Sequence, residues 1–182
     1  MTHLTGKRIA IIAGDFFEEP ELVVPRDRLA AAGADVSVHS PSGEAIQAVK
    51  GDTEPTQQVS VDGTIADVDV SAIDALVVPG GTVNADRLRT DTDAQRLVTA
   101  VHDAGKPLAV ICHGPWLLVS AGLVGGRRLT SFSSLADDIR NAQGDWVDQE
   151  VVVDGHLITS RNPDDLPAFV DALEQALVGS TA

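Results

Sequence analysis

Apolar residues occur along this chain in short, uninterrupted runs. Three runs stand out, at residues 8–13, 75–78 and 107–111. Strands of a parallel sheet are buried on both faces, so they show continuous apolar runs rather than alternating apolar and polar positions. A fourth segment, residues 35–39, does alternate and therefore indicates a more exposed strand.

Helical segments separate these strands. Residues 21–32 and 93–104 carry apolar side chains on one face, and the segments end at Gly33 and Gly105, a common signal for the end of a helix. Strands that alternate with helices are joined by right-handed crossovers, which place helices on both sides of a sheet. The pattern therefore predicts a flavodoxin-like α/β fold with a doubly wound, mostly parallel sheet.

The remaining segments complete one domain over residues 1–182. Residues 42–69 are polar and rich in glycine, which predicts a small hairpin or an excursion at the sheet edge. Asp154 and Gly155 lie between two apolar runs, a strong hairpin signal. The other expected elements are helices at 115–121, 133–142 and 163–178 and strands at 128–131, 146–153 and 157–159.

Charge and hydropathy limit the classes of partner and compartment. The formal net charge of the chain is −14, and such a surface offers no attraction to nucleic acid or to an anionic membrane. No apolar run approaches the roughly 20 residues of a membrane span, and the first run is too short for a signal peptide. These features favour a cytoplasmic protein.

Cys112 is the only cysteine, which excludes an intramolecular disulfide. It follows the run 107–111 directly and precedes His113, Gly114 and Pro115. A nucleophile on a strained turn between a strand and a helix forms a nucleophile elbow, and the helix N-terminus favours the thiolate. Many free cysteines are inert and buried, but the strand, histidine and glycine around Cys112 favour a reactive thiol.

Two other strand ends, at residues 79–81 and 15–21, carry unusual residues that are expected at the same edge of the sheet. Pro79, Gly80 and Gly81 follow the second apolar run, and the N–H groups of the glycines are candidates for an oxyanion hole facing Cys112. A flexible turn explains two glycines equally well. His113 is expected either as a general base or as a further backbone N–H donor.

An acidic loop, residues 15–21, follows the first strand. Acids at a helix start match the helix dipole, and a carboxyl group touching Cys112 would hold its proton and titrate together with the thiol. Four acids here exclude a flavodoxin-like phosphate loop. The histidines lack the paired spacing of a metal site, so neither a metal nor a cofactor is expected. They are His3, His39, His102, His113 and His156.

With these motifs placed, the chain resembles the PfpI-type intracellular protease family. That family belongs to the superfamily of the parkinsonism-associated deglycase, which is built on the class I glutamine amidotransferase-like fold. The resemblance runs through nearly the whole chain. It rests on the strings DFFEEPELVVPRDRLAAAG, LVVPGG, GKPLAVICHGPWLL, GRRLTSF, WVDQEVVVDG and TSRNPDDLPAF.

The resemblance implies roles for particular residues. Cys112 would be the nucleophile and His113 its partner, with Glu18 or Glu21 as the acid near the sulfur. Glu21 lies four residues before Pro25, the spacing of the thiol-contacting acid in the deglycase branch, whereas Glu18 matches the Phe-Glu pair of PfpI-like members. Both assignments stay open at this point.

The resemblance also implies a homo-oligomer, a dimer or larger, with the site near an interface. In PfpI-type enzymes a carboxylate from a neighbouring subunit completes a Cys-His-acid triad, and Asp86 is the matching position here. Some members have a tyrosine where this chain has Phe132, so a mechanism that uses that hydroxyl is not expected. True glutamine amidotransferases need a late His-x-Glu, whereas His156 is followed by Leu157 and Ile158.

The expected function is that of a cysteine-dependent, stress-related hydrolase that acts on a small molecule or a peptide. Peptide-bond hydrolysis and glyoxalase or deglycase action on methylglyoxal and its adducts both begin with thiolate attack on a carbonyl. The alternative is a non-enzymatic redox-sensing or chaperone-like stress protein that uses oxidation of Cys112. The sequence leaves these alternatives open.

Overall fold

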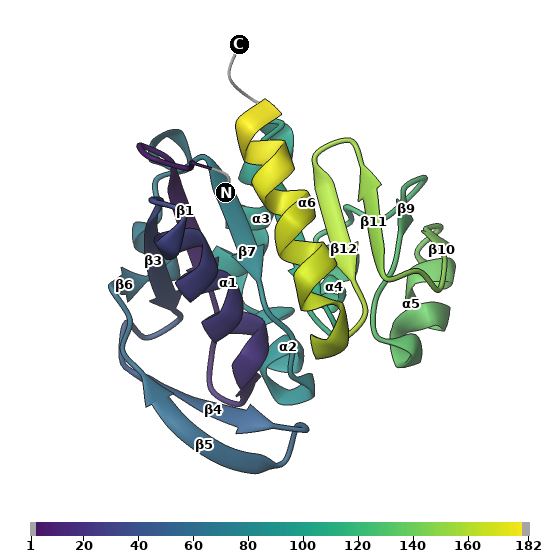
Figure 1. Cartoon of the computed structure of the whole chain (residues 1–182). Coiled ribbons are helices and arrows are strands. Elements are labelled where there is room, and N and C mark those ends of the chain that lie inside the picture. The colour runs from purple at the N-terminus through teal and green to yellow at the C-terminus, as the bar shows by residue number, and fades with distance from the viewer. Residues whose placement is uncertain (1–2, 180–182) are drawn as a thin grey trace.

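A seven-stranded sheet runs through the middle of the computed structural model, which describes residues 3–179 (Figure 1). β11 pairs with β12 in antiparallel fashion, and the other neighbouring strands are parallel. Across the sheet, the strands are β11 (Val151–Asp154), β12 (Leu157–Ser160), β8 (Leu108–Ile111), β7 (Ala75–Val78), β1 (Arg8–Ile12), β3 (Asp35–Ser40) and β6 (Gly63–Thr64).

Helices cover both faces of this sheet. In Figure 1, α1 (Glu19–Ala31) and α6 (Leu166–Gly179) lie in front, and α3 (Thr92–Asp103) and α4 (Pro115–Ser120) lie behind. Successive residues of β1 belong to the two different cores on either side of the sheet. This division explains the continuous apolar runs, and it confirms the predicted mostly parallel α/β architecture.

A hairpin stands beyond the carboxyl edge of the sheet. It consists of β4 (Ile46–Lys50) and β5 (Glu54–Val59), which pair in antiparallel fashion. The short strand β2 (Phe17–Glu18) joins β4 and so ties the loop after β1 to the hairpin. The hairpin expected within residues 42–69 is confirmed, and Figure 1 shows it below the main sheet.

Two elements differ from the prediction. The single strand expected at residues 146–153 is divided into β10 (Asp145–Trp146), which pairs with β9 (Arg128–Leu129), and β11, which joins the main sheet. The intervening residues 148–150 are exposed and polar, so neither sheet gains by extending through them. The helix α2 (Thr82–Leu88) was not expected, because its N-cap is Gly81, which has no side chain to signal a helix start.

Other expected elements hold with small shifts at their ends. The hairpin at Asp154 and Gly155 is confirmed, with Gly155 in the left-handed conformation at φ 64°. α5 (Ala136–Asn141) follows a 3₁₀ turn rather than starting at Ser133. Among residues 3–179, no helix is long and apolar enough to cross a bilayer. The assignment of residues 1–182 to one domain stays a prediction.

Candidate active site around Cys112

Cys112 occupies the turn between β8 and α4 in a left-handed conformation, with φ 62°. Such a conformation costs about 1–3 kcal/mol for a residue other than glycine, so it persists only when neighbouring structure holds it. Two backbone hydrogen bonds hold Cys112 in this conformation. The Cys112 N–H donates to the Ser160 carbonyl at 3.0 Å, and the Cys112 carbonyl accepts from the Phe132 N–H at 2.8 Å. The expected elbow is therefore anchored to β12 and to the segment after β9.

Glycines allow the strand ends to approach the cysteine closely. A Cβ on Gly80 would lie 2.6 Å from the Cβ of Cys112, and a Cβ on Gly114 would lie 2.8 Å from Cγ1 of Val110. Two carbon atoms at these distances would overlap, and the close-packed interior leaves no room for either of them to move away. Gly80 is thus required by its packing against Cys112, and Gly114 by its packing against β8.

Glu21 contributes a fully buried carboxyl group from the first turn of α1. Its Oε2 accepts the Gly80 N–H at 2.7 Å, and the carboxyl also lies against the Cys112 thiol. Burial raises the pKa of Glu21 to about 8, although the hydrogen bonds from Gly80 and Cys112 act to lower it. Glu21 is therefore protonated at neutral pH and has a proton to donate to sulfur.

Glu18 faces a different part of the structure. Its carboxylate accepts the N–H groups of Gly51 at 2.9 Å and Asp52 at 3.1 Å, and its side chain is buried. Glu18 therefore holds the tip of the β4–β5 hairpin. Of the two acids that the sequence left open, the geometry brings Glu21 to Cys112.

Backbone N–H groups from two segments, the turn after β7 and the elbow itself, act on the Cys112 sulfur. Burial raises the pKa of the Cys112 thiol, and an ionised Glu21 would raise it further, whereas the N–H groups of Gly81 and His113 act to lower it. These two groups remain the candidates for an oxyanion hole. The expectation for Gly80 differs from the structure, because its N–H is already donated to Glu21.

His113 contacts the thiol directly. Its Nδ1 lies 3.2 Å from Sγ of Cys112, so these sequence neighbours form a pair across the turn. The ring stacks on Phe132 with centroids 4.6 Å apart. Burial lowers the pKa of His113, and the negative charge of Asp52 raises it. A histidine that is mainly neutral can accept the thiol proton.

Two hydroxyl groups approach the other ring nitrogen of His113. Nε2 lies 3.3 Å from Oγ1 of Thr82 and 3.2 Å from Oγ of Ser134. Thr82 in turn is bound to Asp52 in the hairpin tip. The sequence did not identify these three residues. They come from separate segments, and nothing in their local pattern signals that they meet at His113.

Asp86 lies exposed on α2. Among residues 3–179 of one chain, the hydrogen-bonding partners of the His113 ring are Cys112, Thr82 and Ser134, and Asp86 is not one of them. Its expected role in a neighbouring subunit stays a prediction.

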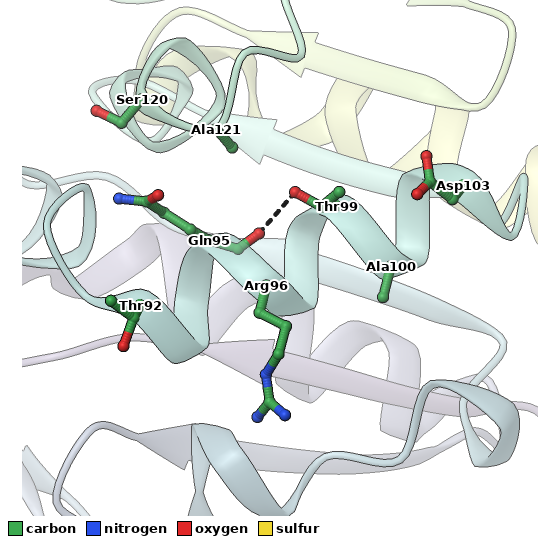
Figure 2. Close-up of a pocket in the computed structure, with 8 residues that line it drawn as sticks. All are labelled: Thr92, Gln95, Arg96, Thr99, Ala100, Asp103, Ser120 and Ala121. Carbon is green, nitrogen blue, oxygen red and sulfur yellow. Dashed lines mark hydrogen bonds between the residues drawn. The ribbon is translucent and has the colours of Figure 1, made fainter.

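An open hollow elsewhere on the surface carries none of the expected site residues. Figure 2 shows it between α3 and the end of α4, lined by side chains such as Gln95, Arg96 and Ser120. The Thr99 hydroxyl there donates to the Gln95 carbonyl at 2.8 Å within the helix. Across residues 3–179, no group of three or more His, Cys, Asp or Glu residues is arranged to hold a metal ion.

Comparison with known proteins gives one consistent result. The profile of the DJ-1/PfpI family matches residues 7–176. Protein/nucleic acid deglycase 2 of Escherichia coli is 42% identical over 169 residues, which cover 90% of this chain and 94% of that protein. General stress protein 18 of Bacillus subtilis is 40% identical over 166 residues, covering 90% of this chain and 94% of that protein.

The fold comparison agrees. The crystal structure of Drosophila melanogaster DJ-1beta superposes with a TM-score of 0.85 at 30% sequence identity. The match covers 96% of this chain and 91% of that one.

Proposed function

The chain belongs to the DJ-1/PfpI family, and from this premise we propose that it is a cysteine-dependent glyoxalase or deglycase acting on methylglyoxal and its early adducts. The observation that carries the proposal is the fully buried carboxyl group of Glu21 beside a thiol that also contacts His113. This arrangement supplies a nucleophile, a base and an acid within one small site. The names of the relatives, a deglycase and a stress protein, support the same class.

The proposed reaction begins at the aldehyde carbon of methylglyoxal. Nδ1 of His113 takes the thiol proton, the Cys112 sulfur attacks the carbon, and the resulting alkoxide is stabilised by the N–H groups of Gly81 and His113. Glu21 and His113 then move a proton from that carbon to the neighbouring carbonyl carbon, and the proton that His113 took from the thiol passes to the oxygen of that carbonyl. The hemithioacetal alkoxide becomes a thioester, and His113 is neutral again. Water cleaves the thioester to lactate and restores the thiol, so the sum is methylglyoxal plus water giving lactate.

The burial of the nucleophile supports a small substrate. Cys112 is only 6% exposed, and an aldehyde of a few atoms reaches such a sulfur more easily than a folded or extended protein chain does. Peptide-bond hydrolysis would use the same first step and is the other chemistry of this class. A homo-oligomer in which Asp86 of one subunit approaches His113 of another, working in the cytoplasm, completes the proposal.

A redox sensor is the competing class of function. The protonated Glu21 would stabilise an oxidised Cys112 by donating a hydrogen bond to a sulfinate oxygen. A sensor reacts once and needs no organic substrate, whereas an enzyme releases product repeatedly from reduced protein.

The test compares substrates on freshly reduced protein. Methylglyoxal, methylglyoxal-treated N-acetylarginine and an unstructured peptide are each incubated with wild type and with Cys112→Ser, and lactate and new amines are quantified. Lactate from the first two substrates with wild type alone supports the proposal. Cleavage of the peptide without lactate would transfer the assignment to a peptidase.

A further inference from the structure

A continuous chain of hydrogen-bonding groups leads from Cys112 to a carboxylate of the same polypeptide. Nδ1 of His113 lies 3.2 Å from the sulfur, and its Nε2 lies 3.3 Å from Oγ1 of Thr82. The Thr82 hydroxyl donates to Oδ2 of Asp52 at 3.0 Å. The groups come from three separate places: the elbow, the first residue of α2 and the tip of the β4–β5 hairpin.

The chemistry of the donors fixes the direction of this chain. An ionised carboxylate only accepts hydrogen bonds, so the single proton of the Thr82 hydroxyl is committed to Asp52. The hydroxyl oxygen is then left as an acceptor toward His113, and this favours the tautomer with hydrogen on Nε2. Nδ1 is consequently free of hydrogen and faces the thiol as a base.

Asp52, the carboxylate at the end of this chain of hydrogen bonds, is itself held in place by its neighbours. Asp52 has a left-handed backbone, φ 64°, and its N–H donates to the buried carboxylate of Glu18 at 3.1 Å. Its Oδ1 accepts the Thr82 N–H at 2.7 Å. A partner that is fixed on both its backbone and its side chain orients an imidazole with little loss of entropy.

We propose that Asp52, acting through the Thr82 hydroxyl, is a positioning residue that orients and polarises His113 within a single chain. The inference deepens the proposed function, since it rests on Cys112 as the reacting group. It gives this chain an internal acid for the histidine, independent of any carboxylate from a neighbouring subunit. Glu18 then has a supporting role, because it holds the hairpin tip that carries Asp52.

A purely structural role for Asp52 would be to cap α2, whose own N-cap, Gly81, has no side chain. The two roles use different atoms of Thr82, so they can be separated. Thr82→Val keeps the N–H bond to Oδ1 and loses only the hydroxyl link. Thr82→Ser restores the hydroxyl, and Asp52→Asn keeps the shape but removes the charge and presents a donor to the hydroxyl.

The experiment measures the rate at which iodoacetamide alkylates Cys112 as a function of pH. The chain has one cysteine, so every label reports this sulfur. The charged and titratable groups facing the pair are Glu21 from α1 and Asp52 from the hairpin. Loss of the negative charge of Asp52 makes the imidazolium less favourable, so less thiolate forms at neutral pH.

The expected result is a loss of about tenfold in the alkylation rate near neutral pH for Thr82→Val, the size of one hydrogen bond to a charged group. Asp52→Asn is expected to lose at least as much and to move the midpoint of the profile to higher pH. Thr82→Ser should recover the wild-type profile. Asp91→Ala, which removes the capping side chain of α3, should lower the melting temperature and leave the midpoint in place.

Two results from the Thr82→Val and Asp52→Asn variants would overturn the proposal. One is a wild-type profile for Thr82→Val and Asp52→Asn. The other is a general loss of rate in both, with an unmoved midpoint that follows the loss of stability. Ser134→Ala completes the set, because a shift found there and absent from Thr82→Val would assign the orientation of His113 to Ser134 instead. Alkylation needs no substrate, so a shifted profile in a protein that makes no lactate would reject the proposed function and leave this inference standing.

Discussion

Replacing Glu21 by glutamine should stabilise the protein at neutral and alkaline pH. Glutamine has nearly the same shape, and its carbonyl oxygen can still accept the Gly80 N–H that Oε2 accepts at 2.7 Å. It carries no ionisable proton, however. The variant therefore removes the cost of a buried carboxyl group while keeping its packing.

The size of the effect follows from the pKa. Burial raises the pKa of Glu21 from 4.5 to about 8, and each pH unit of difference corresponds to about 1.4 kcal/mol. Between these two pH values the folded protein holds a proton that the unfolded chain releases, so the free energy of unfolding falls as pH rises. The fall reaches about 5 kcal/mol above the folded pKa, and at pH 7 it is about 3 kcal/mol.

Urea denaturation of wild type and Glu21→Gln from about pH 5 to about pH 9 measures this difference. The two unfolding free energies should diverge steadily with rising pH and become parallel only above the folded pKa. The same pair in a Cys112→Ala background separates the carboxyl from the coupled thiol. Curves that stay parallel across the whole range would refute a proton held by Glu21. Turnover should fall by about 100-fold in Glu21→Gln, because the acid is lost.

Further predictions concern packing and a second titrating pair. Gly80→Ala should abolish alkylation and turnover, because its Cβ would lie 2.6 Å from that of Cys112, whereas Gly125→Ala, with its nearest contact at 3.6 Å, should behave as wild type in both assays. His102 and His156 contact each other at 3.0 Å between Nδ1 and Nε2, and burial lowers the pKa of both. The unfolded chain then binds protons first, so stability should be lost as pH falls below about 6.5. In urea denaturation at pH 7 and 5, His156→Gln should lose less stability than wild type, and an equal loss would contradict the coupling.

The parts of the fold that depend on local pattern were predictable. The strands around residues 9–11 and 108–111 are buried on both faces, and their sequences show it directly. α2 and the division between β10 and β11 were missed, because one lacks a capping side chain and the other is decided by which partner strand each piece meets.

At the candidate active site, too, residues placed by local sequence pattern were predictable, and residues placed by contacts between distant segments were not. Cys112, Gly81 and His113 are set by the local elbow and turn motifs, and the structure brings them together. The choice between Glu18 and Glu21 depends on where α1 begins relative to the hairpin. Asp52 reaches His113 only through Thr82, a contact between segments 30 residues apart in sequence. Local pattern cannot carry such information.

The most direct test of the account is the number of lactate molecules formed per protein under anaerobic conditions. Fully reduced wild type is mixed with an excess of methylglyoxal, beside Cys112→Ser, and lactate is counted over time. The account predicts many lactate molecules per wild-type chain and none above background from the variant. A yield of one or fewer per chain, or equal lactate from both proteins, would contradict catalysis at Cys112.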